Sequence, residues 1–240
     1  MNILLIGYGA MGKRLETIIE TSNHTLIGII TSQTTKYPNH FEKVLIPDII
    51  IDFSHYAILN KTLEYAKLHH IPLIIATTGH SNENLEKIRS VSQAIPLLLT
   101  TNTSYGVSAI VKLLKVATPL LKNWDIEIIE KHHNKKMDAP SGTAHTLVET
   151  IESSSGFAHE KIFGRSGLRK RTKNEISVHS VRGGTIIGEH SILFCGQDEV
   201  IEIKHSALSK DVFAYGALKM AELLVDKPSQ LYTMQDLIQI

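Results

Sequence analysis

Residues 1–20 read MNILLIGYGAMGKRLETIIE. An apolar run at 2–6, three glycines and helix-forming residues at 11–20 predict a strand, a tight turn and a helix. The glycines spell GxGxxG, a turn in which the backbone approaches a dinucleotide pyrophosphate and the helix packs closely on the strand. The alternative is a glycine turn without a ligand. The context of strand and helix favours a dinucleotide-binding turn, with contacts at Gly7, Tyr8, Gly9, Ala10, Met11 and Gly12.

Strands and helices continue to alternate as far as residue 102. Apolar runs at 25–30, 46–53, 72–76 and 97–99 predict strands, and helical spacing at 58–69 and 82–94 predicts helices. The isoleucine-rich runs suit strands that are covered on both faces, as in a parallel sheet. We therefore expect an α/β fold whose first domain, residues 1–103, is a doubly wound (Rossmann) sheet.

The pattern changes after residue 102. A helix at 108–121 and a strand at 125–130 are followed by a loop, then by strands at 176–181, 185–194 and 199–205 that resemble a meander. Residues 153–175 predict mostly loop, and 211–225 return to a helical pattern. We expect a smaller α+β domain with a mixed sheet at 104–210.

Composition and charge limit the class of protein. The 240 residues are 42% hydrophobic and 20% charged, which is typical of a soluble globular protein. Lys and Arg number 25 against 24 Asp and Glu, so the net charge of +1 argues against nucleic-acid or anionic-membrane partners. The single cysteine has no disulfide partner, no apolar run is long enough to cross a bilayer, and the first strand leaves no room for a signal peptide. These features predict a cytoplasmic protein.

The cofactor is expected at the carboxyl ends of the first domain's strands. Candidate contacts there are Ser32, Phe53, Ala76, Thr77 and Thr78. Helix capping and turn formation explain the hydroxyl residues almost as well. No carboxylate follows the second strand at 31–33 to repel a 2′-phosphate, so NADPH is expected to be at least tolerated. Three residues are candidates to bind that phosphate or are ordinary surface cations: Lys13, Arg14 and Lys36.

Residues 130–144, EKHHNKKMDAPSGTA, combine proton-transferring and cationic side chains. The adjacent imidazoles of His132 and His133 titrate near neutrality, and Lys136 adds a fixed positive charge. Ser141 resembles the N-cap of a helix, whose first free backbone N–H groups attract an anion. We expect this loop to bind and protonate an anionic substrate.

Several of these residue types also have less specific interpretations. His69 and His70 form a second adjacent pair, for which a cation near a helix C-terminus is a sufficient explanation. Adjacent histidines do not usually chelate one ion and no third ligand lies at a recognisable spacing, so no metal is expected. Lys136 could also be a surface charge paired with Asp138. Arg182, in the turn at 182–184, is a candidate to bind a carboxylate.

The chain resembles a known family, the dihydrodipicolinate (4-hydroxy-tetrahydrodipicolinate) reductases of bacterial diaminopimelate and lysine biosynthesis. The resemblance covers nearly the whole chain and rests on residues 7–12, 52–54, 77–79, 102, 130–144 and 182–190. It implies a nucleotide-binding domain completed by the C-terminal segment 211–240. It also implies a substrate-binding domain that assembles a homotetramer, and hydride transfer from NADPH or NADH to a cyclic dicarboxylate.

The resemblance further implies roles for single residues of the histidine loop. His132 is expected to donate the proton, with Lys136 as a second donor, and His133 is expected to contact the substrate. A substrate carboxylate is expected at the helix start, residues Ser141, Gly142 and Thr143.

At the cofactor end, the resemblance implies nicotinamide contacts by Thr101, Asn102 and Thr103. The family usually has alanine or proline before this asparagine and an aromatic residue after it, so the threonines predict a more polar contact. Two other functions fit the same pattern less well. One is a related oxidoreductase of an amino or sugar acid, which a substrate panel would distinguish. The other is a regulatory NAD(P)-binding protein without turnover, which would leave the histidine loop unexplained.

Overall fold

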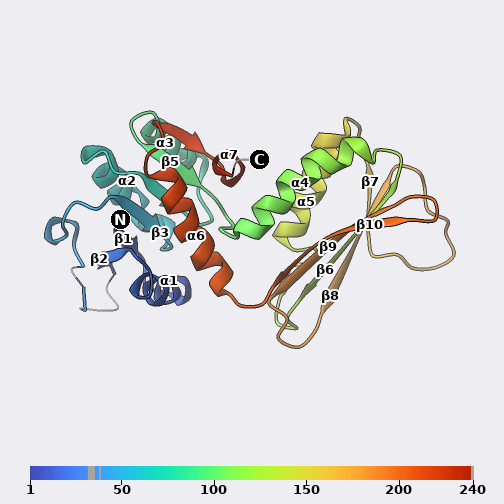
Figure 1. The fold of residues 1–240 in the computed structure, drawn as a ribbon, viewed down its shortest axis with the longest axis horizontal. Helices are drawn as coiled ribbons and strands as arrows, with labels where there is room; N and C mark the ends of the chain where they lie inside the picture. The colour runs from blue at the N-terminus through green and yellow to red at the C-terminus, as the bar shows by residue number, and fades with distance from the viewer. Residues whose placement is uncertain (32–35, 38, 239–240) are drawn as a thin grey trace. The chain divides into compact units, whose positions relative to one another are not determined.

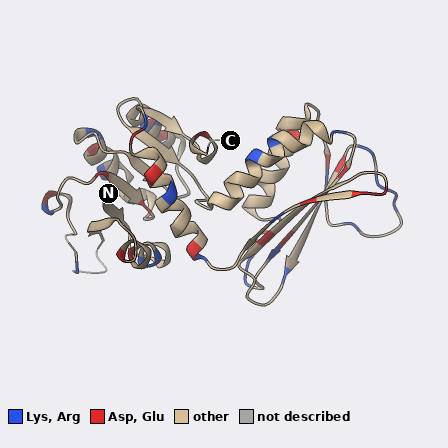
Figure 2. Ribbon diagram, viewed as in Figure 1, with Lys and Arg blue, Asp and Glu red and all other residues tan. Residues whose placement is uncertain are grey.

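The structure, a computed structural model, describes residues 1–31, 36–37 and 39–238, and it divides into two compact units (Figure 1). Unit 1 comprises Met1–Tyr105 and Asp211–Ile240, and unit 2 comprises Gly106–Lys210. Basic and acidic residues are interspersed along both units (Figure 2). The α/β fold class is confirmed, because unit 1 has a parallel sheet and unit 2 a mixed one.

Unit 1 is built on six parallel strands in the order β11-β5-β4-β3-β1-β2. They are β1 (Asn2–Ile6), β2 (Thr25–Ile30), β3 (Ile49–Asp52), β4 (Leu73–Ile75), β5 (Pro96–Leu99) and β11 (Gln230–Tyr232). The chain runs from β1 to β2 on one side and then crosses to β3 on the other. The strand order therefore reverses between β1 and β3, where doubly wound sheets bind their ligands. The edge strand β11 was not predicted.

Helices cover both faces of this sheet. On one face lie α1 (Ala10–Glu20) and α6 (Asp211–Leu224), and on the other lie α2 (Leu59–Leu68) and α3 (Asn82–Ser92). Ile3 and Leu5 of β1 belong to the first core, whereas Leu4 and Ile6 belong to the second. Because successive strand residues point to opposite faces, burial on both sides explains why these strands are continuous apolar runs. The remaining short helices are η1 (Phe41–Lys43), η2 (Tyr56–Ile58) and α7 (Met234–Leu237).

Unit 2 has five strands in the order β10-β9-β6-β8-β7, with two helices on one face (Figure 1). The strands are β6 (Asp125–His132), β7 (Glu160–Phe163), β8 (Glu175–Arg182), β9 (Gly188–Cys195) and β10 (Val200–Ala207). The helices α4 (Tyr105–Leu120) and α5 (Gly142–Ser155) pack Leu114 and Leu147 onto a core that includes Ile128, Val178 and Ile192.

The predicted meander is wrong in one respect. β9 and β10 do form an antiparallel hairpin, but β6 lies between β8 and β9, parallel to the first and antiparallel to the second. Alternation of apolar and polar residues identifies a strand without specifying its partner, and β6 presents the same alternation as both neighbours. The segment 153–175 also contains more structure than predicted, because β7 pairs in parallel with β8.

Ion pairs fasten the loop after β7 to the sheet. Glu175, 1% exposed, accepts hydrogen bonds from Arg169 (2.8 Å) and Ser177 (3.2 Å) and also pairs with Arg165. Arg171 donates hydrogen bonds to Asp125 (2.8 Å) and Glu127 (3.2 Å), both on β6. A buried carboxylate with several donors fixes the loop more firmly than exposed pairs do.

Candidate active site

The glycine turn of unit 1 has the geometry that a dinucleotide site requires. Gly7 adopts a φ of +93°, and a Cβ there would lie 2.8 Å from the Cα of Ser54. A Cβ on Gly12 would collide with the carbonyl oxygen of Gly7, so α1 can pack closely on β1 only with glycine at this position. Nothing lies within 4 Å of the Cβ position of Gly9, which caps α1. The turn therefore leaves room for a phosphate at the helix start.

The predicted cofactor residues follow four neighbouring strands. Because β5, β4, β3 and β1 are parallel neighbours, their carboxyl ends share one edge of the sheet. Gly7 follows β1, Phe53 follows β3, residues 76–78 follow β4 and Thr101 follows β5. Thr77 is buried and its hydroxyl lies 2.8 Å from His80 Nε2. Ser32 lies outside the described residues.

The end of β5 is held from within unit 1. Thr103 is 3% exposed, and its hydroxyl donates a 2.7 Å hydrogen bond to the carbonyl of Phe213 in α6. A Cβ on Gly216 would collide with the Thr103 carbonyl, so the chain passes directly against α6. Asn102 Oδ1 accepts from the backbone N–H of Ser104 at 2.9 Å. The Thr103 hydroxyl thus has an internal partner, while Thr101 is exposed and Asn102 half-buried.

Two of the three candidate phosphate ligands are already in ion pairs. Arg14 pairs with Asp211, and Lys36 lies 2.7 Å from the nearly buried carboxylate of Glu16 and 2.8 Å from Glu20. Lys13 instead lies over the Tyr8 ring, 5.6 Å from its centroid. Near the end of β2, a hollow of about 480 Å³ is lined by Ile30, Asn39, His40, Phe41, Glu42, Ile58, Lys61, Glu64, Tyr65 and Leu68.

Asp52, at the end of β3, supports the turn beside Gly7. Its Oδ1 accepts hydrogen bonds from the backbone N–H (2.8 Å) and hydroxyl (2.5 Å) of Ser54. Among the described residues, nothing hydrogen-bonds to its buried Oδ2. Burial raises the pKa of Asp52 to about 6, and the Ser54 hydrogen bonds only partly offset this.

Asp52→Asn is expected to flatten the pH dependence of stability. Because the folded pKa is raised, the unfolded chain loses its proton first as pH increases. The Asp52 contribution to the free energy of unfolding should therefore fall by about 3 kcal/mol between pH 4 and pH 7. Urea unfolding at several pH values should show the difference between wild type and variant changing across this window. The exposed Asp226→Asn is the control; a pH-independent difference for Asp52→Asn would contradict the assignment.

In unit 2, one face of β6 carries both the core and the candidate site. Ile126 and Ile128 point into the core, and two-residue alternation places Glu130 and His132 on the same face. The predicted strand ended at Glu130, but β6 continues to His132. His132 is thus held on a strand, whereas half-buried His133 begins the loop.

Glu130 is the centre of this polar cluster. It is fully buried, and its Oε2 accepts from His132 Nδ1 at 2.6 Å and from Arg182 Nη1 at 2.9 Å. Its Oε1 accepts from the backbone N–H of Ser141 at 3.2 Å and from Arg182 Nη2 at 2.6 Å. Burial alone would raise the pKa of Glu130, but the donors, led by Arg182 and including Ser180, lower it to about 2. The carboxylate is therefore ionised at neutral pH.

A second histidine faces His132 from β9. The His132 and His190 rings lie 5.2 Å apart edge to face, and His190 Nε2 lies 3.1 Å from Ser141 Oγ. Burial lowers the pKa of His190 to about 4, so this ring is neutral at physiological pH. Burial also lowers the pKa of His132, and Glu130 opposes that effect. A Cβ on Gly188 would lie 3.2 Å from His132 Nε2.

The predicted helix start is confirmed. Ser141 is the N-cap of α5, and its Oγ accepts from the backbone N–H of Ala144 at 3.2 Å. The first residues of α5, Gly142 and Thr143, follow directly, with the exposed Gly142 leaving open space around it. Lys136 lies in the preceding loop, 2.7 Å from Asp138. The helix start, a cation and the histidine paired with Glu130 are thus all part of one unit.

Arg182 has a partner that the sequence did not indicate. Both terminal guanidinium nitrogens bind Glu130, and Nη2 also donates to the Asp138 carbonyl. The Arg182 guanidinium therefore binds Glu130 and the Asp138 carbonyl of this chain. Binding of a ligand carboxylate by Arg182 stays a prediction. The roles of Glu130, Gly188 and His190 were also missed. One signal for Glu130 is present in the sequence: it continues the alternation of Ile126 and Ile128 with a charged side chain, which places that charge on the buried face of the strand.

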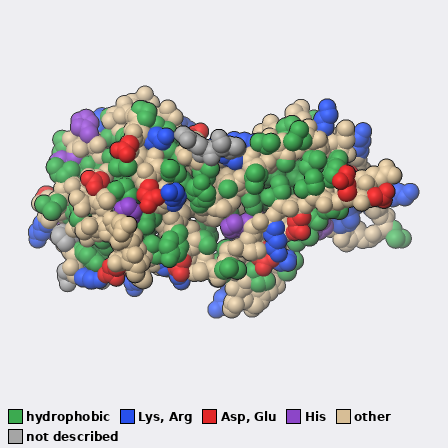
Figure 3. Space-filling model, viewed as in Figure 1, with side chains coloured by type: hydrophobic (Ala, Val, Ile, Leu, Met, Phe, Trp, Pro, Cys, Tyr) green, Lys and Arg blue, Asp and Glu red, His purple; other side chains and the backbone are tan. Residues whose placement is uncertain are grey.

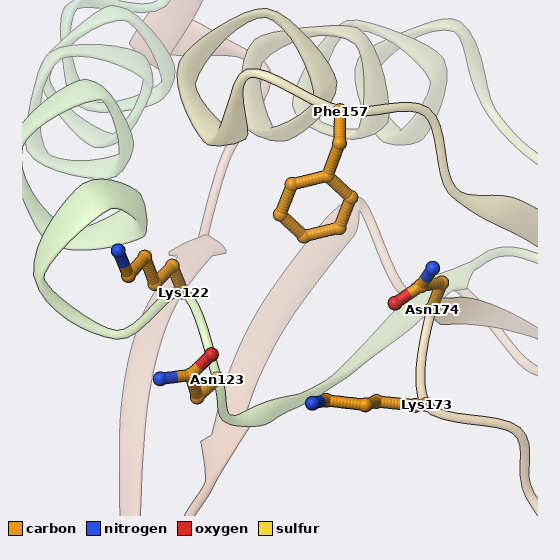
Figure 4. Close-up of a pocket in the computed structure, with 5 residues that line it drawn as sticks. All are labelled: Lys122, Asn123, Phe157, Lys173 and Asn174. Atoms are coloured by element: carbon orange, nitrogen blue, oxygen red, sulfur yellow. The ribbon is translucent and has the colours of Figure 1, made fainter.

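A separate pocket of about 230 Å³ lies at the opposite end of β6 (Figure 4). It is lined by Lys122, Asn123, Phe157, Lys173 and Asn174. All five are exposed, and none belongs to the Glu130 cluster. Within the described ranges, no group of three or more His, Cys, Asp or Glu side chains is placed to hold a metal ion. No helix in the described part of the chain is long and apolar enough to cross a membrane.

Comparison with known proteins agrees with this geometry. The family model for the N-terminus of dihydrodipicolinate reductase matches residues 1–103, and that for the C-terminus matches 106–238. The chain belongs to the dihydrodipicolinate reductase family. A 4-hydroxy-tetrahydrodipicolinate reductase of Staphylococcus saprophyticus is 44% identical, covering 99% of this chain and 100% of the relative. That of Exiguobacterium is 43% identical, covering 100% and 96%.

A solved structure shows the same dihydrodipicolinate reductase fold. The dipicolinate-bound enzyme from Paenisporosarcina sp. TG-14 has a TM-score of 0.81 at 20% identity, covering 99% of this chain and 100% of that one. The chain is accordingly an oxidoreductase of the dihydrodipicolinate reductase family with a dinucleotide-binding N-terminal domain.

Proposed function

We propose that this protein reduces 4-hydroxy-tetrahydrodipicolinate to tetrahydrodipicolinate with NADPH or NADH, with loss of the 4-hydroxyl group as water, in the diaminopimelate and lysine pathway. The observation that carries the proposal is the Glu130–His132 cluster beside the N-cap of α5, in a chain that matches the family over its whole length. Relatives at 43–44% identity bear this activity as their name.

The residues of unit 2 supply binding and a proton. Gly142 and Thr143 are the first residues of α5, and a helix N-terminus suits a substrate carboxylate. Lys136 and His133 supply further cationic and hydrogen-bonding contacts near it. His132 donates its Nε2 proton to the ring carbon next to the one that receives the hydride, because its Nδ1 faces Glu130.

Unit 1 supplies the cofactor site. Gly7, Gly9 and Gly12 form a turn that fits a pyrophosphate, and the hollow near β2 and α2 suits the adenosine half. When bound, the nicotinamide supplies the hydride; residues 76–78 and 101–103 are the proposed contacts for that half. Lys13, with no carboxylate partner among the described residues, is the best placed of the three cations for a 2′-phosphate, so we infer that NADPH is accepted.

An assay tests the proposal directly. Purified protein should oxidise NADPH or NADH, read at the nicotinamide absorbance, when the fresh condensation product of aspartate semialdehyde and pyruvate is supplied. Neither precursor alone should support oxidation. Absence of oxidation with both cofactors would refute the function, and a panel of amino and sugar acids would identify a related oxidoreductase instead.

We further propose a homotetramer formed through the unit 2 sheet. Its helices cover one face, while residues on the other face, such as Ile129 and Leu193, are only half-buried. On the helix-covered face, α4 has exposed hydrophobic side chains, among them Leu113, Val116 and Leu120. Figure 3 shows hydrophobic side chains gathered over this helix. Light scattering after gel filtration should give the mass of four 26.7 kDa chains.

Gly188→Ala is expected to reduce turnover by about 10- to 100-fold, because small displacements of a reacting group carry such costs. The added methyl would lie 3.2 Å from His132 Nε2, the proton-donating atom. Gly183→Ala is the matched control, since its Cβ would meet nothing within 4 Å. Steady-state kinetics with saturating cofactor provide the measurement, and equal turnover for both variants would contradict the role of Nε2.

A further inference from the structure

We propose that Glu130 is a positioning residue that holds the Nδ1 proton of His132, so that Nε2 is the ring nitrogen that gives its proton to the substrate. The inference rests on the proposed function for the reaction, although the tautomer itself can be read without substrate. In this role the buried Glu130 carboxylate acts through His132 and does not contact the ligand.

The groups around Glu130 determine which atoms donate and which accept. Arg182 stays protonated and can only donate, and it donates to both carboxylate oxygens. The Ser141 backbone N–H donates to Oε1. The carboxylate is therefore ionised and can only accept. Its 2.6 Å contact with His132 requires a proton on Nδ1, in the neutral ring as well as in the imidazolium.

The other ring nitrogen, Nε2, lies beside Gly188. The Cβ position of Gly188 is 3.2 Å from His132 Nε2 and 3.5 Å from Cδ2, so a side chain larger than that of glycine would cover this edge of the ring. In neutral His132 the fixed Nδ1 proton leaves Nε2 with a lone pair, which is able to take up the next proton. Each cycle then needs only one proton to enter and leave at Nε2.

Glu130 also connects the acid to the anion-binding helix start. One oxygen holds His132 and the other holds the backbone of Ser141, the N-cap of α5. Because both contacts are made by one buried carboxylate clamped by Arg182, the proton donor and the proposed carboxylate site keep a fixed separation. Such support of a reacting group by its neighbours is how active sites maintain orientation.

Glu130→Gln tests the proposal because an amide has only one accepting oxygen. The Oε1 position faces two groups that can only donate, the Ser141 N–H and Arg182 Nη2, whereas Oε2 faces one, Arg182 Nη1, besides His132. The amide oxygen is therefore expected at the Oε1 position and the NH₂ group opposite His132 Nδ1. Nδ1 must then accept, which moves the neutral ring's proton to Nε2. The groups left facing His132 are Arg182, Lys136 and His190, so its pKa should fall by about one to three units.

The measurement uses full-length protein with ¹⁵N-labelled histidine, followed by long-range ¹H–¹⁵N spectra across pH. Signals of His132 are assigned by their loss in His132→Gln. Wild type should show neutral His132 protonated on Nδ1, and Glu130→Gln should show the Nε2 tautomer with a lower pKa. Its kcat should fall by about 10²- to 10⁴-fold with a smaller change in KM.

Glu175→Gln is the matched control, because Glu175 is an equally buried, arginine-paired carboxylate at the far end of the same sheet. It should leave the tautomer and pKa of His132 unchanged, even if stability falls. Neutral wild-type His132 protonated on Nε2 would overturn the proposal, as would a Glu130→Gln protein with unchanged tautomer and pKa. Should that variant fail to fold, the wild-type tautomer decides. The Nδ1 tautomer in a protein that oxidises neither NADPH nor NADH would refute the proposed reaction alone.

Discussion

His132→Gln is expected to lower kcat by about 10²- to 10⁴-fold, the usual contribution of a positioned general acid. Glutamine can keep a hydrogen bond to Glu130 but cannot deliver a proton, so the cofactor should bind normally while reduction stalls. Calorimetric titration of NADPH and steady-state kinetics with the condensation product separate the two effects. Wild-type turnover in this variant would remove His132 from the proton-donating role.

His145→Gln is the control for His132→Gln. It changes an exposed histidine of α5 outside the Glu130 cluster and should leave kcat unchanged.

Lys136→Ala should instead raise KM as well as lower kcat, because its ammonium is proposed to bind the substrate and to interact more strongly with the transition state. A Lys136 effect on kcat alone would limit this residue to the chemical step.

Arg182→Met is expected to destabilise unit 2 by about 3–5 kcal/mol, the cost of leaving a buried charge without its partner. Glu130 is fully buried and would lose both guanidinium hydrogen bonds. Its lowered pKa contributes stability above its ordinary value of 4.5, and this is lost as pH falls toward about 2. The loss caused by Arg182→Met should therefore be largest near neutrality and shrink below about pH 4.5.

Urea unfolding followed by fluorescence of Trp124, which packs against the unit 2 core, measures this change. Lys131→Met is the control on β6, the strand of Glu130. Lys131 forms a solvent-accessible 3.4 Å pair with Glu189, so its loss should cost less than about 1 kcal/mol. The double variant Glu130→Gln with Arg182→Met should be more stable than the two single losses predict, because the unpaired charge is gone. Strict additivity would contradict a direct charge pair.

Features encoded in adjacent residues could be predicted from the sequence. The turn from Gly7 to Gly12 and the N-cap at Ser141 each depend on backbone conformation and hydrogen bonds within a few residues. Both lie where the sequence indicated. The family resemblance is also confirmed by matches over the whole chain.

Features that depend on partners distant in sequence could not. Glu130 and Arg182 are 52 residues apart, and only the parallel pairing of β6 with β8 brings them together. The predicted meander is wrong because of the same pairing, since alternation identifies the faces of a strand and not its neighbours. For the same reason the sequence predicts a ligand carboxylate as the partner of Arg182, whereas its guanidinium binds Glu130 of this chain.

The division of unit 1 between two distant segments affects how the chain is made on the ribosome. α6 buries Ala217, Met220 and Leu224 in the unit 1 core, and β11 pairs with β5, yet both are translated after all of unit 2. The first 105 residues therefore emerge with one face of their sheet covered by α1 alone, while unit 2 can complete its core from contiguous sequence. Domains generally fold as they are synthesised, so unit 2 is expected to fold before unit 1 is complete.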